Sequence, residues 1–245
     1  MNPTIRSLRR ASLTAGLALT AMSLLAAFGV FGATKPLLTA GDAATTAAAI
    51  LGSQSLFRAG VAALVLVVVL DVVVAAALLT LFTPVNRGIA VMAAWFRVAY
   101  AAVYLVAILQ LVLALDLLDE PALAMRAIHA YETIWLVGLI LFGVHLLLLG
   151  YLAYASGFMA KVFGILLVVA GLGYVVDGFA AVLVARPVVS IGSFTFVGEV
   201  VLIFWLLIVG RRGSFGRGDA DQGPVLEPAA DLLGTPTERR PVNVR

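Results

Sequence analysis

The sequence predicts an all-α, polytopic membrane protein with six transmembrane helices. Of its 245 residues, 63% are hydrophobic and only 12% are charged, so polar side chains are too few to cover the surface of a soluble chain of this length. Apolar runs of about 18 residues or more recur along it, the length needed to cross a hydrocarbon core of about 30 Å. Because backbone polar groups in hydrocarbon must be bonded locally, these runs are expected to be helices.

The predicted transmembrane domain covers residues 1–210. Its six helices are expected near residues 8–31, 56–82, 89–115, 131–154, 162–184 and 191–209. The start "MNPTIRSLRR" followed by an apolar run resembles a secretory signal. That apolar run is longer than the roughly 7–15 residues typical of a signal, so we expect the first helix to be retained.

Two segments lie outside these spans. Asp42, which follows Gly41, is expected to cap a short alanine-rich helix lying along the outer membrane surface. Residues 211–245 are polar and rich in glycine, proline and charge. Such a composition cannot bury enough apolar surface to offset the entropy of ordering, so this segment is predicted to be a disordered cytoplasmic tail.

The basic residues predict the orientation, because lysine and arginine concentrate in cytoplasmic loops. With the N-terminus inside, the cytoplasmic basic residues near helix ends are Arg6, Arg9, Arg10, Arg87, Lys161, Arg211, Arg212 and Arg217. Those on the opposite side are Lys35, Arg58, Arg126 and Arg186. We therefore expect a protein of a bacterial inner membrane with both termini in the cytoplasm.

Glycines recur every seven residues through the predicted fourth and fifth helices. Residues seven apart lie nearly on one face of a helix, and small residues let membrane helices approach closely. This spacing predicts a tightly packed helical hairpin, although glycine is frequent in membrane helices and the spacing also has a chance interpretation. The packing glycines are Gly143, Gly150, Gly164, Gly171 and Gly178, with Gly157 in the turn.

Asp71 and Arg97 are predicted to form an ion pair. They lie roughly 14 residues before and 12 residues after the centre of the turn "TPVNRG", and hence at similar depth on adjacent antiparallel helices. An ionisable group at that depth is costly and needs a partner. The favoured interpretation is that this pair holds two helices together, and the alternative is a functional role.

A second group of polar residues forms the candidate binding cluster. Asp177 and Glu199 are expected at matching depth on neighbouring helices, and Tyr174 lies one turn before Asp177. Adjacent carboxylates at low dielectric favour a shared proton, a bound cation or a basic ligand. The alternative is a packing network with protonated carboxyls. The candidate members are Asp177, Glu199, His145, Tyr174 and Arg58.

Several function classes are disfavoured. The chain has no cysteine, which excludes thiolate metal sites and nucleophiles. It lacks the G-x-S-x-G and H-E-x-x-H signatures, so no catalytic residue, metal site or cofactor is assigned and an enzyme is not the favoured interpretation. Its basic residues are dispersed, so a nucleic-acid partner is not expected. The expected partner is the lipid bilayer.

The order of several motifs is similar to that of a family of bacterial membrane proteins defined by a domain of unknown function, DUF4386. The resemblance runs from about the first helix to Val209, and one departure is Ala160, where the family is expected to have proline. The resemblance supports the predicted topology but implies no activity. The motifs are "SLFRAG", "LFTPVNRGIAVMAAWFRV", "IHAYE", "LFGVHLLLLGYLAYASGF", "GILLVVAGLGYVVDGFA" and "FVGEVVLIFWLLIVG".

The sequence leaves three functional hypotheses. The first is a membrane protein whose intramembrane polar site binds or moves a small solute or a proton. The second is a structural or partner-binding subunit whose buried charges only set helix packing. The third, with the least support, is an intramembrane enzyme acting on lipid, since it depends only on His145 with nearby carboxyls.

Overall fold

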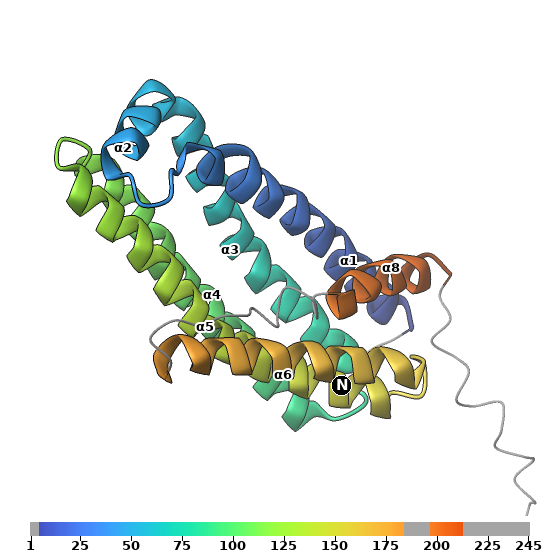
Figure 1. Cartoon of the computed structure of the whole chain (residues 1–245). Coiled ribbons are helices and arrows are strands. Elements are labelled where there is room, and N and C mark those ends of the chain that lie inside the picture. Colours follow the sequence, from blue (N-terminus) through green and yellow to red (C-terminus); the bar gives the residue numbers. More distant parts are fainter. Residues whose placement is uncertain (1–4, 184–196, 213–245) are drawn as a thin grey trace, which may run out of the picture.

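The computed structural model describes residues 5–183 and 197–212, and these ranges are dominated by long helices with no strand among them (Figure 1). Five segments are long and apolar enough to cross a membrane: Ile5–Leu37, Gln54–Phe82, Arg87–Asp116, Pro121–Ala155 and Lys161–Leu183. The sixth predicted span, residues 191–209, begins outside the described ranges. Its described part belongs to α8 (Val197–Arg212), which has 16 residues.

The first span is built from three kinds of helix. α1 (Ile5–Ala27) continues into a π-helix, η1 (Phe28–Thr34), and ends in a single 3₁₀ turn, η2 (Lys35–Leu37). Gly29 lies against the backbone of Gly60, because a Cβ added there would lie 3.0 Å from the Gly60 carbonyl oxygen. π-Helical segments are rare and occur often at functional sites. This one lies where the first span approaches the following transmembrane helix.

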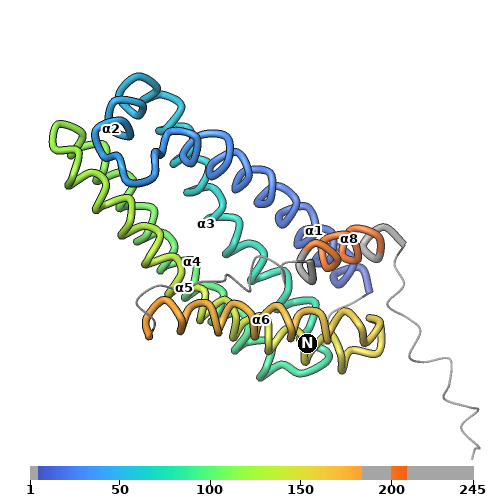
Figure 2. The backbone as a smooth tube through the Cα atoms, viewed as in Figure 1, coloured from blue at the N-terminus to red at the C-terminus, as the bar shows by residue number. Residues whose placement is uncertain are grey.

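The remaining helices run back and forth across the molecule. α3 (Gln54–Phe82) is antiparallel to α1, and α4 (Arg87–Asp116), α5 (Pro121–Ala155) and α6 (Lys161–Leu183) follow in alternating directions. The helix bundle has two ends (Figure 2). α2 (Ala43–Gly52) and the α4–α5 turn lie at one end, here called the α2 end. The start of α1 and the α3–α4 and α5–α6 turns lie at the other, here called the Arg87 end.

α5 begins at Pro121, well before the start at residue 131 that hydropathy predicted. Pro121 is its first residue, a position where the missing N–H has no helical partner to lose. His129 and Glu132 therefore lie inside the helix rather than at its end, and their side chains stay exposed. The additional turns extend α5 toward α2.

Asp42 caps α2, as the sequence predicts. Its carboxylate accepts hydrogen bonds from the Thr45 backbone N–H at 2.9 Å and from the Thr45 hydroxyl at 2.7 Å. These bonds lower the pKa of Asp42, because they stabilise the charged form. α2 therefore begins with an ionised cap at neutral pH.

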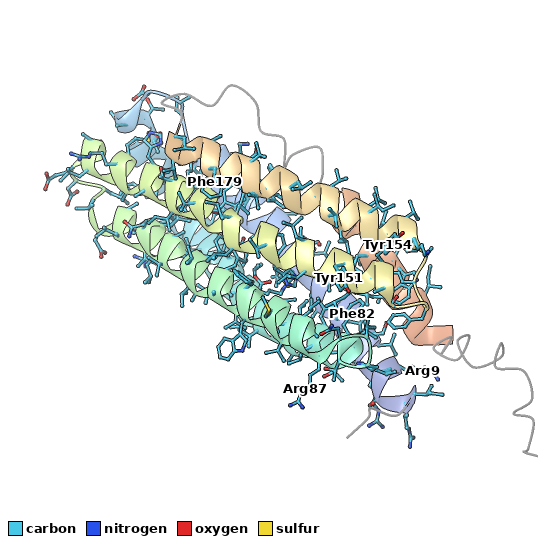
Figure 3. The ribbon with its side chains drawn as sticks, turned by 90° about the horizontal axis from the view of Figure 1, so that it is seen from below. Arg9, Phe82, Arg87, Tyr151, Tyr154 and Phe179 are labelled. Atoms are coloured by element: carbon cyan, nitrogen blue, oxygen red, sulfur yellow. The ribbon has the colours of Figure 1, made fainter. Side chains whose placement is uncertain are left out.

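α5 and α6 form a closely packed antiparallel hairpin, and Figure 3 shows the two helices side by side along their length. A Cβ added at Gly143 would lie 2.6 Å from the Gly171 carbonyl oxygen, and one added at Gly150 would lie 2.7 Å from the Gly164 carbonyl oxygen. The backbones touch at these points, so no larger residue fits without a shift. Gly157, in the turn, has φ +69°, a conformation that favours glycine.

Helix α8 packs beside the first half of α1 (Figures 1 and 2). The Ser12 hydroxyl donates a buried hydrogen bond of 2.8 Å to the Leu206 carbonyl. At the Arg87 end the rings of Phe82, Phe158 and Trp205 stack in sequence, with centroids 6.0 Å and 5.9 Å apart. Helix α8 is thus joined both to α1 and to the α5–α6 turn.

The distribution of polarity is the reverse of that of a soluble protein. Large apolar side chains such as Leu66, Val69 and Leu109 are more than half exposed on the outside. Four aspartate, arginine or histidine side chains, in contrast, are buried among the described helices: Asp71, Arg97, His145 and Asp177. An apolar outside with a polar interior suits a lipid bilayer, where exposed apolar surface is stable and polar groups need partners.

Candidate functional site

The site is centred on an ion pair between α3 and α4. The short α3–α4 turn is ordered by Asn86, whose side chain accepts a hydrogen bond of 3.1 Å from the Ile89 backbone N–H. Asp71 lies 11 residues before Phe82 and Arg97 lies 10 residues after Arg87, so both are about 15 Å along their helices from this turn. Arg97 Nη2 lies 2.7 Å from Asp71 Oδ1, and both side chains are at most 4% exposed.

His145 on α5 extends this pair to a third helix. Its Nε2 lies 3.2 Å from Arg97 Nη1, and its Nδ1 lies 2.9 Å from the Ala93 carbonyl oxygen. The carbonyl can only accept and the guanidinium can only donate, which places the proton on Nδ1 and leaves Nε2 as the acceptor. This arrangement requires a neutral imidazole. Asp71, Arg97 and His145 are called the buried network below.

Two polar atoms of the buried network have incomplete hydrogen bonding. Among the described residues, Asp71 Oδ1 and Arg97 Nε are the buried side-chain atoms without a hydrogen-bond partner. The Asp71 oxygen is close to Arg97 Nη2, but the contact has the geometry of an ion pair and lacks the direction of a hydrogen bond. Asp71 Oδ1 is still neutralised by that pair, whereas Arg97 Nε has no polar partner among the described residues, which for a buried group costs about 1–3 kcal/mol.

Aromatic rings cover one side of the buried network. The Arg97 guanidinium carbon lies 5.4 Å from the centre of the Phe142 ring, in range of a cation–π interaction. Phe142 also packs on Tyr100 and Tyr174, at centroid distances of 4.9 Å and 5.5 Å. Trp135 Nε1 donates a hydrogen bond of 3.3 Å to the Tyr100 hydroxyl. The rings come from α4, α5 and α6.

A cavity of about 270 Å³, here called the inner cavity, reaches the ion pair. Asp71, Arg97, Tyr100, Phe142 and Tyr174 are in its wall, together with apolar residues from α1, α3, α5 and α8. The His145 ring lies 5.8 Å from the Phe142 ring, between centroids, and His145 is not in that wall. The inner cavity is therefore lined by the Asp71–Arg97 ion pair, here called its floor, and by aromatic rings.

A second cavity of about 640 Å³, the outer cavity, adjoins the first and extends toward the α2 end. Its wall includes Lys35, Tyr104, Tyr131, Glu132 and Asp177. Six residues belong to both walls, which makes the cavities neighbours: Ala26, Val67, Tyr100, Trp135, Leu139 and Tyr174. The π-helix contributes Val30 and Thr34, so the irregular part of the first span forms part of this wall.

The five residues of the candidate binding cluster do not lie together in the structure. Asp177 is buried and, with Tyr174, lines the outer cavity. His145 instead bonds to Arg97 in the buried network. Arg58 is exposed and is in the wall of neither cavity. Glu199 belongs to the first turn of α8, and its side chain lies outside the described part of the chain.

Sequence reasoning missed the link between His145 and Arg97 and the aromatic wall. A signal for the wall was present, because Arg97, Tyr100 and Tyr104 are three and four residues apart and share one face of α4. Tyr100 and Tyr104 are buried and stacked, with centroids 5.8 Å apart. No group of three or more histidine, aspartate or glutamate residues with metal-ligand geometry occurs among the described residues.

Comparison with known proteins gives one match. The sequence model of the family described as "Domain of unknown function (DUF4386)" matches residues 14–210. That range contains every residue of the buried network and of both cavity walls. No curated protein and no solved structure matches this chain.

Proposed function

We propose that this chain, which belongs to the DUF4386 family, is a six-helix protein of the bacterial inner membrane that binds a small amphipathic molecule within the bilayer. The observation that carries the proposal is the contact between the buried network and the inner cavity. A pair that served only to join α3 and α4 has no need of a cavity beside it, and here Asp71 and Arg97 both line one.

The chemistry of the wall indicates the class of ligand. Asp71 and Arg97 neutralise one another and His145 is neutral, so the floor favours a neutral ligand over an ion. Asp71 and Arg97 both line the cavity, so a polar group of the ligand can approach them. The rings of Tyr100 and Phe142 favour a flat, apolar body. We infer a ring-bearing molecule with a carbonyl or hydroxyl group directed at Arg97.

The size of the two cavities fits this class. Ligand sites are typically about 300–1,000 Å³ and mostly apolar with a few polar groups, a range that the adjoining inner and outer cavities reach together. The polar residues near the α2 end, among them Lys35 and Glu132, provide a wetter entrance. If both termini are cytoplasmic, as the arginines at the Arg87 end favour, the entrance is on the outer side of the membrane.

Proton transfer through His145 is less well supported by the geometry. Nδ1 and Nε2 are both engaged, and His145 is not in the wall of the inner cavity. A relay would have to break the bond to Arg97 in each cycle. Binding of a neutral molecule needs no such rearrangement.

The test fills the cavity and measures what co-purifies. The full chain is expressed in bacteria and purified in mild detergent, and bound small molecules are extracted and identified by mass spectrometry. Leu139, which belongs to both walls, is replaced in the variant Leu139→Trp. We expect wild-type protein to retain a neutral, ring-bearing molecule and this variant to lose most of it.

The matched control is Val137→Trp, two residues away on the same helix but exposed on the outside. It adds the same bulk without entering either cavity, so it should retain the molecule. Both variants must elute as folded protein at the wild-type position in size-exclusion chromatography. Finding no co-purified molecule in the wild type, or equal loss in both variants, would contradict the proposal.

A further inference from the structure

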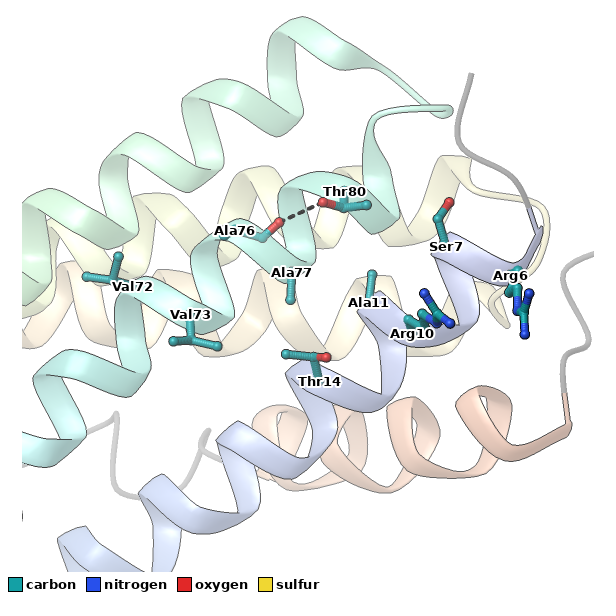
Figure 4. Close-up of a pocket in the computed structure, with 10 residues that line it drawn as sticks. All are labelled: Arg6, Ser7, Arg10, Ala11, Thr14, Val72, Val73, Ala76, Ala77 and Thr80. Atoms are coloured by element: carbon teal, nitrogen blue, oxygen red, sulfur yellow. Dashed lines mark hydrogen bonds between the residues drawn. The ribbon is translucent and has the colours of Figure 1, made fainter. Parts of the chain in front are cut away.

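A second hollow lies on the outside of the molecule, between α1 and α3 at the Arg87 end (Figure 4). Its volume is about 600 Å³, and it is separate from both cavities described above. It is called the α1–α3 groove below. Its lining residues are Arg6, Ser7, Arg10, Ala11, Thr14, Val72, Val73, Ala76, Ala77 and Thr80.

The two ends of the groove differ in chemistry. Arg6 and Arg10 are one helical turn apart and exposed at the mouth, near the beginning of α1. Farther along α3 the lining is apolar, with Val72 and Val73 48% and 38% exposed. Because α1 and α3 are antiparallel, the groove runs from the arginines toward the middle of the helices. This is the shape of a charged headgroup site followed by a slot for a hydrocarbon chain.

Charge complementarity identifies the occupant. The described residues that line it include two arginines and no carboxylate. Within residues 5–183 and 197–212 neither Arg6 nor Arg10 takes part in an ion pair. The Thr80 hydroxyl donates to its own helix, to the Ala76 carbonyl at 3.0 Å (Figure 4). Guanidinium groups bind phosphate strongly and with defined geometry.

Small residues create the hollow. Ala11 on α1 and Ala76 and Ala77 on α3 occupy positions where larger side chains would fill the space between the helices. We propose that the α1–α3 groove binds an anionic phospholipid, with the phosphate between Arg6 and Arg10 and one acyl chain against Val72 and Val73. This site is independent of the ligand proposed for the inner cavity.

The test measures lipid preference on the full-length protein. The chain is purified in detergent, incubated with equal amounts of phosphatidylglycerol and phosphatidylcholine, and analysed by native mass spectrometry. We expect the wild type to retain phosphatidylglycerol preferentially. Replacing both arginines in Arg6→Gln/Arg10→Gln should reduce that preference roughly tenfold or more, because each basic residue contributes to attraction of anionic lipid.

The control removes the same charge elsewhere. Arg9 and Arg87 are exposed at the same end of the molecule but are not part of the groove (Figure 3), so Arg9→Gln/Arg87→Gln should leave the preference nearly unchanged. A third variant, Ala76→Phe, fills the slot and keeps both arginines. It should also lose phosphatidylglycerol.

Three outcomes would overturn the proposal. Equal loss in the two arginine pairs would mean that overall charge at this end, rather than the groove, attracts the lipid. Full retention by Ala76→Phe would mean that no acyl chain enters the slot. Displacement of the lipid signal by excess inorganic phosphate would identify a simple anion site. None of these three outcomes would change the loss of ligand expected for the Leu139→Trp variant, because that test concerns the inner cavity.

Discussion

Arg97 connects three helices through one planar group, and its binding partners differ in kind. Nη2 forms an ion pair with the Asp71 carboxylate on α3, Nη1 hydrogen-bonds the His145 imidazole on α5, and the ring of Phe142 covers one face. Lysine could not replace it, because a single ammonium lacks the planar fork that reaches several partners at once. The residue therefore joins α3, α4 and α5 and also lines the inner cavity.

At this scale the first prediction concerns charge balance. Asp71→Asn leaves Arg97 buried without a counter-ion, and we expect a loss of about 3–5 kcal/mol in the free energy of unfolding. Arg97→Gln should cost a similar amount. The double variant Asp71→Asn/Arg97→Gln should recover much of the loss, as measured by SDS-induced unfolding in mixed micelles. Additive losses in the double variant would show that the pair does not contribute as a unit.

The α5–α6 hairpin determines where the walls of the cavities lie. Its backbones touch at Gly143 with Gly171 and at Gly150 with Gly164. In a bilayer no hydrophobic effect draws helices together, so close backbone contact and dispersion must hold them. This contact fixes Tyr174 and Asp177 of α6 relative to Phe142 of α5. The glycines thus act on the site through helix position.

The second prediction tests that packing. A Cβ at Gly150 would lie 2.7 Å both from the Gly164 carbonyl oxygen and from Val168 Cγ2. Gly150→Ala should therefore reduce the free energy of unfolding by about 1–3 kcal/mol. The control is Gly52→Ala at the end of α2, where an added Cβ meets nothing within 4 Å and φ is not positive. Equal effects of the two substitutions would argue against a close α5–α6 contact.

On the scale of the whole molecule, the distribution of polarity and the position of the turns determine how the chain sits in a bilayer. Apolar side chains cover the outside and the buried network lies near the middle of the long helices. The start of α1 and the α3–α4 and α5–α6 turns share the Arg87 end, and these segments carry many of the arginines and lysines. The cavities extend toward the opposite end.

The third prediction is that the two ends face opposite sides of the membrane. A reporter active only in the cytoplasm, fused after Gly210, should be active, since the C-terminus is expected inside. The same reporter inserted between Asp119 and Glu120, in the α4–α5 turn at the α2 end, should be inactive. A reporter active only outside should give the reverse pattern. The same result at both positions would exclude the proposed six-helix arrangement.

Local properties of the sequence were sufficient for much of this description. Hydropathy located the five long helices, and Asp42 was recognised as a cap because capping depends only on neighbouring residues. Asp71 and Arg97 were paired by counting from a turn that they share, and the structure places them 2.7 Å apart. Hydropathy placed the start of α5 too late, because residues 121–130 include polar side chains that lie outside the apolar run.

Only the tertiary structure decided which helices meet across longer separations. His145 and Arg97 are 48 residues apart, and no turn-based count links them. The sequence placed His145 in one candidate cluster with Asp177 and Glu199, but position along a helix does not fix the direction in which a side chain points around it. That direction depends on which faces pack, and the contacts at Gly143 and Gly150 turn α5 so that His145 reaches Arg97. Composition determined that the chain suits a bilayer, and helix packing decided that its buried charges line a cavity.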